Sequence, residues 1–90
     1  MFQSHNYSRV LFYAYILKSL KDSSFYYGST KDIKVRLKEH NSGKVNYTNG
    51  HKPYILHYKE SFESRKEAMA REKFFKSIDG YIWLKSKKII

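Results

Sequence analysis

Residues 10–29 read VLFYAYILKSLKDSSFYYGS, and this stretch decides the fold. Its first part, residues 10–17, is β-branched and aromatic, which predicts a strand buried on both faces or nearly so. Polar residues over 18–24 predict a turn, and residues 25–29 predict a second, short strand. Because two strands joined by a short polar link pair side by side, the stretch predicts an antiparallel hairpin.

A helix and a polar loop are expected after the hairpin. Ser29 and Asp32 have the S-x-x-D form of a capping box, which predicts the start of a helix over residues 31–41. Gly43 stands where a glycine often ends a helix. Residues 41–53 are then expected to form a polar loop.

Strand and helix patterns fill the rest of the chain. Residues 54–62 alternate partly between apolar and polar types and predict a third strand. A helix is predicted over 63–78, a break at Asp79 and Gly80, and a last helix over 81–88. The order ββαβαα predicts an α+β fold, in which a small three-stranded antiparallel sheet is flanked by helices.

Length and composition exclude several classes of protein. Ninety residues suit one domain, here residues 10–90, preceded by a flexible tail over 1–9. The absence of cysteine excludes a disulfide scaffold, a thiol nucleophile and a thiolate zinc site, and it fits a cytoplasmic protein. The longest apolar run is eight residues, whereas a membrane helix needs about 20. We therefore expect no membrane association.

The charge points to a class of partner. The chain has 18 Lys and Arg against 8 Asp and Glu, a formal net charge of +10 at pH 7. Such an excess favours a polyanion, most often nucleic acid, over a surface that is charged only for solvation.

Two functional side chains are expected on the first helix. At about 100° per residue, His40 falls on the apolar stripe with Ile33 and Leu37, and Arg36 borders that stripe one turn away. Each residue also has an ordinary interpretation, the histidine as a buried structural group and the arginine as a chain that extends to water. Together, facing a sheet that carries tyrosines, they form a candidate site.

A carboxylate borders the apolar stripe of the second long helix. That stripe consists of Ala68, Phe74, Phe75 and Ile78. Glu72 lies beside it and is expected to be only partly solvated. The alternative is an ordinary i, i+4 ion pair with Lys76 on an exposed edge, and spacing alone does not decide between the two.

The nine tyrosines have three interpretations. They are strand and core residues with hydroxyls at the surface, or they stack on bases, or they transfer protons. A phenol with a pKa of about 10 is a poor base unless its surroundings change that pKa.

The tyrosine-rich segments carry a resemblance. Tyr13-Ala14-Tyr15 followed by Tyr26-Tyr27-Gly28 resembles the paired signature of the GIY-YIG nuclease family. The stretches STKDIKVRLKEHNSGK (29–44) and RKEAMAREKFFK (65–76) resemble the same family. The likeness is strongest to its small single-domain members, which resemble the N-terminal nuclease domain of the excision-repair protein UvrC.

The resemblance implies catalytic roles for five residues. Tyr15 and Tyr26 match the two motif tyrosines, one of which deprotonates the attacking water directly or in relay. Arg36 matches the arginine that holds the scissile phosphate, and His40 matches a position that orients that water or shares its proton. Glu72 matches the single carboxylate that binds one divalent metal.

The resemblance also implies a reaction and a substrate. It implies a metal-dependent endonuclease that uses Mg²⁺ or Mn²⁺ to nick DNA, leaving a 5′-phosphate and a 3′-hydroxyl, in repair or recombination. Lys31 and Lys44 are expected to bind the nucleic acid together with Arg36. Target selection is expected to come from DNA shape or from a protein partner.

The sequence departs from the family pattern in places. Tyr13, Ala14 and Tyr27 replace a glycine and two isoleucines of the motifs, which are backbone and packing positions. Many relatives carry a late asparagine, but here none follows Asn49, so its role is unfilled or met by Ser77 or Lys76. The alternatives to a nuclease are a non-cleaving DNA- or RNA-binding module that retains the fold and a basic structural protein of a ribonucleoprotein.

Overall fold

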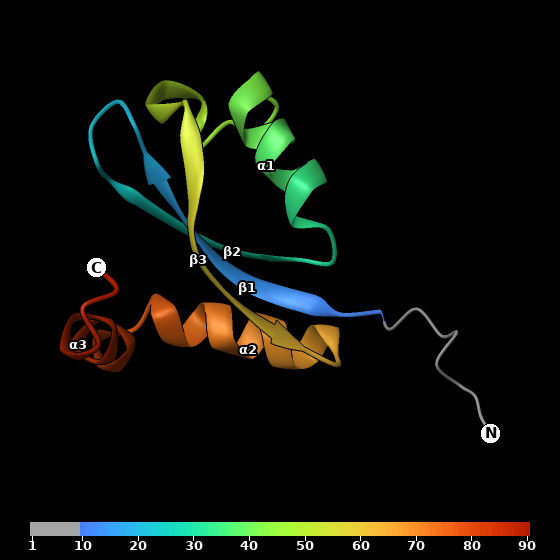
Figure 1. The fold of residues 1–90 in the computed structure, drawn as a ribbon, viewed down its shortest axis with the longest axis vertical. Helices are drawn as coiled ribbons and strands as arrows, with labels where there is room; N and C mark the ends of the chain where they lie inside the picture. Colours follow the sequence, from blue (N-terminus) through green and yellow to red (C-terminus); the bar gives the residue numbers. More distant parts are fainter. Residues whose placement is uncertain (1–9) are drawn as a thin grey trace.

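A three-stranded antiparallel sheet separates two helical layers in the computed structural model, which describes residues 10–90 (Figure 1). The strand order is β2-β1-β3, so the first strand is central. The elements in chain order are β1 (Phe12–Ser19), β2 (Phe25–Thr30), α1 (Ile33–Ser42), a short 3-10 turn (Asn49–His51), β3 (Tyr54–Phe62), α2 (Arg65–Phe75) and α3 (Ile78–Ser86). The predicted α+β fold and its order ββαβαα are confirmed.

The central strand β1 supplies both halves of the core. Helix α1 covers one face of the sheet, and α2 and α3 cover the other (Figure 1). Because side chains alternate along a strand, β1 contributes to a cluster on each face. The cluster on the α2 and α3 side contains Ala14, Ile16, Phe75 and Leu84. The cluster on the α1 side contains Tyr15, Leu17 and Tyr54, with Ile33 and Leu37 of α1 packed against it.

Several element boundaries differ from the prediction. Strand β1 begins two residues later than expected and extends to Ser19, whereas β3 has the predicted bounds. The predicted capping box is wrong, because Asp32 alone caps α1 by accepting the Val35 amide at 3.1 Å. Ser29 belongs to β2 and its hydroxyl binds elsewhere. The helix end at Gly43 is confirmed, with φ of 86°.

The predicted break at Asp79 and Gly80 is also wrong. Helix α2 ends at Phe75, and α3 starts afresh at Ile78, where the Ser77 side chain accepts the Gly80 amide. Gly80 lies in the first turn of α3, so it does not end a helix. Ile78, expected in the apolar stripe of α2, is 80% exposed because α3 runs in a new direction.

Gly80→Ala is expected to destabilise the fold by about 3 kcal/mol or more, although alanine ordinarily favours a helix interior over glycine. A Cβ at Gly80 would lie 1.7 Å from the carbonyl oxygen of Phe74, so backbone would have to move. Gly50→Ala is the matched control, because nothing lies within 4 Å of its added Cβ, and it should change stability by less than about 0.5 kcal/mol. Urea unfolding measures both, and equal stability of the two variants would contradict the close contact.

The predicted tail over residues 1–9 lies outside the described residues. Within residues 10–90, none of the helices has the length and apolar character to cross a bilayer.

Candidate active site

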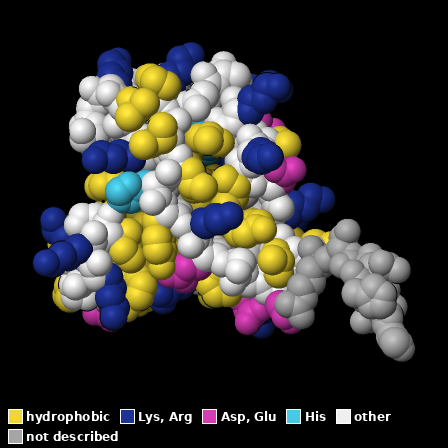
Figure 2. Space-filling view, viewed as in Figure 1, with side chains coloured by type: hydrophobic (Ala, Val, Ile, Leu, Met, Phe, Trp, Pro, Cys, Tyr) yellow, Lys and Arg dark blue, Asp and Glu magenta, His cyan; other side chains and the backbone are white. Residues whose placement is uncertain are grey.

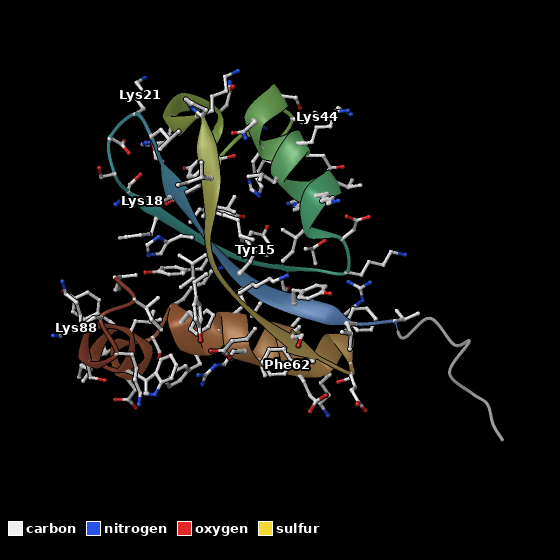
Figure 3. The ribbon with its side chains drawn as sticks, in the orientation of Figure 1. Tyr15, Lys18, Lys21, Lys44, Phe62 and Lys88 are labelled. Carbon is white, nitrogen blue, oxygen red and sulfur yellow. The ribbon has the colours of Figure 1, made fainter. Side chains whose placement is uncertain are left out.

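Three buried side chains form a chain of hydrogen bonds beneath α1. The Tyr15 hydroxyl lies 3.1 Å from Nε2 of His40, and Nδ1 of His40 lies 2.8 Å from Oγ1 of Thr48. Tyr15 is 2% exposed, and His40 and Thr48 are fully buried. These hydrogen bonds link β1, α1 and the loop before β3. Figure 3 labels Tyr15 on the side of the sheet that faces α1.

Gly28 makes room for the Tyr15 hydroxyl on the neighbouring strand. Tyr15 pairs with Gly28 across the sheet, and a Cβ at Gly28 would lie 2.4 Å from the Tyr15 hydroxyl oxygen. Any larger residue there would displace the ring. The absence of a side chain at Gly28 therefore determines where the Tyr15 hydroxyl lies.

Arg36 adds a permanent positive charge to this cluster. Its Nη1 donates to Oε1 of Glu39 at 3.0 Å, and the side chain is 37% exposed. Burial raises the pKa of Tyr15 to about 12, and the nearby Arg36 guanidinium opposes that rise. Burial, followed by the charge of Arg36, lowers the pKa of His40 to about 4. At neutral pH the site therefore contains a protonated phenol and a neutral imidazole.

The low pKa of His40 predicts loss of stability in acid. An unfolded histidine titrates near pH 6.5, so between about pH 6.5 and 4 the unfolded chain binds more protons than the folded one. The free energy of unfolding should therefore fall as pH falls, by up to about 3 kcal/mol from this group. Urea unfolding at pH 7 and pH 4.5 measures this loss. Between these two pH values the free energy of unfolding should fall less in His40→Gln than in the wild type, because the variant lacks the titrating imidazole. Equal losses in both proteins would contradict the buried neutral imidazole.

Glu72 reaches the site from the opposite face of the sheet. It lies on α2, and its Oε1 accepts a 2.7 Å hydrogen bond from Ser29 of β2. Its Oε2 pairs with Nζ of Lys76 at 2.6 Å, and its side chain is 23% exposed. Ser29 follows Gly28 directly, and the negative charge of Glu72 contributes to the raised pKa of Tyr15. The edge strand β2 therefore brings the carboxylate and the tyrosine together.

An open recess lies beside this cluster along β2. Its volume is about 420 Å³, and it is lined by Phe25, Tyr26, Tyr27, Tyr47 and Lys76. The Tyr26 ring lies 4.7 Å from the His40 ring and 5.7 Å from the Tyr47 ring, measured between centroids. Tyr47 is 77% exposed. Of the two motif tyrosines, Tyr15 is buried and Tyr26 lines the recess.

The two predicted nucleic-acid lysines lie at opposite ends of α1. Lys31, just before α1, lines a small hollow with Tyr13, Asp32, Lys34 and Lys59. Lys44 follows the C-terminal end of α1, and Figure 3 labels it there. On the face that Figure 2 shows, basic side chains are scattered over the surface and acidic ones are few. Lysines therefore flank α1 at both of its ends.

The structure brings four of the predicted residues together directly, namely Tyr15, Tyr26, Arg36 and His40, and places Glu72 next to them across β2. Ser29 and Thr48, which hold Glu72 and His40, were not predicted as site residues. Of the two substitutes for the late asparagine, Lys76 contacts Glu72, whereas the Ser77 hydroxyl donates to Phe74 and caps α3.

A single carboxylate would have to anchor any metal ion here. Within residues 10–90, no group of three or more His, Asp or Glu side chains could hold one on its own. Glu72 is a hard oxygen ligand at a partly exposed position, and each of its oxygens has a second lone pair beyond its present partner. These properties suit Mg²⁺ or Mn²⁺, which keep several waters and bind substrate phosphate oxygens.

Comparison with known proteins gives the class of this protein. The family model of the GIY-YIG catalytic domain matches residues 11–80. The chain belongs to the GIY-YIG family, a family of nuclease domains, so nucleic acid is its substrate class.

The relatives of this chain are small proteins. It is 46% identical over 67 residues to a UPF0213 protein of Bacillus licheniformis, covering 73% of this chain and 68% of that protein. It is 43% identical over 77 residues to a UPF0213 protein of Bacillus pumilus, covering 84% and 72%. The solution NMR structure of a UPF0213 protein from Bacillus halodurans is 41% identical, with a TM-score of 0.51, covering 87% of this chain and 85% of that one.

Proposed function

We propose that this protein is a divalent-metal-dependent endonuclease that nicks DNA by hydrolysing one phosphodiester bond. Water attacks phosphorus, the bond from phosphorus to the 3′-oxygen breaks, and the products carry a 5′-phosphate and a 3′-hydroxyl. The observation that carries the proposal is the meeting of Tyr15, Arg36 and His40 with Glu72 across the edge strand β2. By resemblance, DNA repair or recombination is its setting.

Arg36 is assigned to the scissile phosphate. It lies beside the Tyr15 hydroxyl, it is partly exposed, and its planar fork donates several hydrogen bonds at once. A fixed positive charge at the phosphate stabilises the negative charge that develops as water attacks. Its present ion pair with Glu39 is partly exposed to solvent, so exchange of Glu39 for a phosphate costs little.

The two motif tyrosines are assigned different roles. Tyr26 lines the open recess and contacts the His40 ring, so it is the tyrosine that reaches the attacking water. Tyr15 is buried, keeps its proton far above neutral pH, and holds His40 in place beneath the reacting group. The burial of Tyr15 and the open position of Tyr26 support this division of roles.

Glu72 is assigned to the metal. When bound, Mg²⁺ or Mn²⁺ would stabilise the leaving 3′-oxygen as a Lewis acid. Lys76 pairs with one oxygen of Glu72 at 2.6 Å, and its ammonium would be free to contact a phosphate if an ion replaced it there. Lys31 and Lys44 are assigned to the phosphate backbone on either side, where their contacts are independent of sequence.

A plasmid-nicking assay tests the proposal. Wild-type protein with Mg²⁺ or Mn²⁺ should convert supercoiled DNA to open circles, and EDTA should stop the reaction. A Glu72→Gln variant, purified in parallel, separates the protein's own activity from a contaminant. Equal nicking by both proteins would overturn the assigned site. Binding without any nicking would favour the non-cleaving module.

A further inference from the structure

Thr48 is a fully buried polar residue in the loop between α1 and β3. Its Oγ1 lies 2.8 Å from Nδ1 of His40, and the same hydroxyl donates to the carbonyl oxygen of Val45 at 3.3 Å. A hydroxyl has one proton to donate. If that proton is directed to Val45, the Thr48 oxygen is an acceptor, and Nδ1 of His40 must carry the ring proton.

The other end of the imidazole supports the same assignment. With Nδ1 protonated, Nε2 of the neutral ring is an acceptor, and the Tyr15 hydroxyl donates to it over 3.1 Å. The opposite tautomer would make Nε2 the donor, and the Tyr15 proton would then need another acceptor. The cation beside Tyr15 is Arg36, which only donates. Among residues 10–90, only the first arrangement gives every proton of the Tyr15–His40–Thr48 network an acceptor.

The loop that carries Thr48 is fixed at several points. Asn41 at the end of α1 exchanges two hydrogen bonds with the backbone of Tyr54, at 2.6 and 3.0 Å. On the β1 side, the Ser19 hydroxyl donates to the carbonyl of His51, and Nζ of Lys21 donates to that of Gly50. Thr48 is therefore held against His40 by the fold, while the adjacent Tyr47 faces Tyr26 on the open side.

We propose that Thr48 is a positioning residue of this site: its hydroxyl oxygen accepts Nδ1–H of His40 and keeps Nε2 as the acceptor that faces Tyr15. The tautomer follows from these contacts around a buried, neutral ring. Its effect on nicking rests on the proposed function. Without the Thr48 oxygen, the ring is free to adopt either tautomer or to turn, and the Tyr15 hydroxyl loses its fixed partner.

Nitrogen-15 NMR of the histidine side chains tests the proposal directly. In the wild-type protein at pH 7, His40 should show a protonated Nδ1 and an unprotonated Nε2, and a His40→Gln spectrum assigns the signals. Thr48→Ser should keep this pattern, whereas Thr48→Val should show a mixture or the opposite tautomer. A protonated Nε2 in the wild type, or an unchanged pattern in Thr48→Val, would overturn the proposal. The wild-type spectrum decides even if Thr48→Val does not fold.

Nicking kinetics supply the second measurement. Thr48→Val should lower kcat by about 10-fold or more with little change in KM, and Thr48→Ser should stay within about threefold of wild type. Equal loss in both variants would overturn a role through the hydroxyl. The expected NMR pattern in a wild-type protein that does not nick would reject the proposed function and leave the tautomer assignment intact.

Discussion

Glu72→Gln is expected to reduce metal-dependent nicking by about 100-fold or more while leaving the fold and the affinity for DNA almost unchanged. The amide oxygen of glutamine can still accept the Ser29 hydroxyl, so the contact between α2 and β2 survives. What is lost is the negative charge that a divalent ion requires. Because the protein is strongly basic, loss of one carboxylate should not weaken DNA binding.

Glu67→Gln is the matched control for this experiment. Glu67 lies on the same helix, in its exposed first turn, where it accepts the Ser64 hydroxyl at 3.0 Å. The substitution removes the same charge from α2 away from β2, so nicking should stay within about twofold of wild type. Thermal unfolding and DNA binding in EDTA measure fold and affinity for both variants. A Glu72→Gln protein that nicks as fast as Glu67→Gln would contradict the metal assignment.

The sequence predicts the fold well because its local signals agree with the tertiary arrangement. The buried strand over residues 12–19 and the alternating strand over 54–62 each show a pattern that their final burial demands. The helical wheel places His40 on the inner side of α1, where it is in fact fully buried. Periodicity fails at Gly80, because a glycine that permits close backbone contact looks the same in sequence as one that ends a helix.

Contacts between distant segments set the limit of prediction at the site. Ser29 has the spacing of a helix cap, and only the position of α2 against β2 directs its hydroxyl to Glu72 instead. Thr48 lies in a polar loop that has no periodic pattern, and the return of that loop to α1 buries it against His40. Both residues orient a predicted site residue, and these roles depend on partners that lie 43 and eight residues away.

The sequence likewise does not predict that burial gives Tyr15 a different role from Tyr26. The sequence presents two equivalent motif tyrosines, and strand alternation places both on the α1 side of the sheet. The central position of β1 buries the first, whereas the edge position of β2 leaves the second beside an open recess. The difference in chemistry between the two phenols therefore arises from strand order, which the hairpin alone does not specify.

Arg36→Lys is expected to lower kcat by about 100-fold or more, although the substitution keeps the positive charge. The guanidinium has several donors in a fixed plane, so it can serve the Tyr15 hydroxyl and a phosphate at the same time. A lysine ammonium is a single point of charge on a flexible stem and cannot hold both in one geometry. DNA affinity, which depends on the total phosphate neutralisation, should change by less than about threefold.

Arg65→Lys provides the comparison for Arg36→Lys, because Arg65 is exposed at the start of α2, where its guanidinium lies over the Phe12 ring. That variant should nick at close to the wild-type rate, since its charge is retained and its position is outside the cluster. Single-turnover nicking and salt-dependent binding separate the two effects. If the nicking rate of Arg36→Lys were within about threefold of that of Arg65→Lys, positive charge alone would explain the contribution of Arg36 to nicking. The proposal that Arg36 holds the scissile phosphate through two hydrogen bonds of its planar guanidinium would then be wrong, because an ammonium cannot reproduce that geometry.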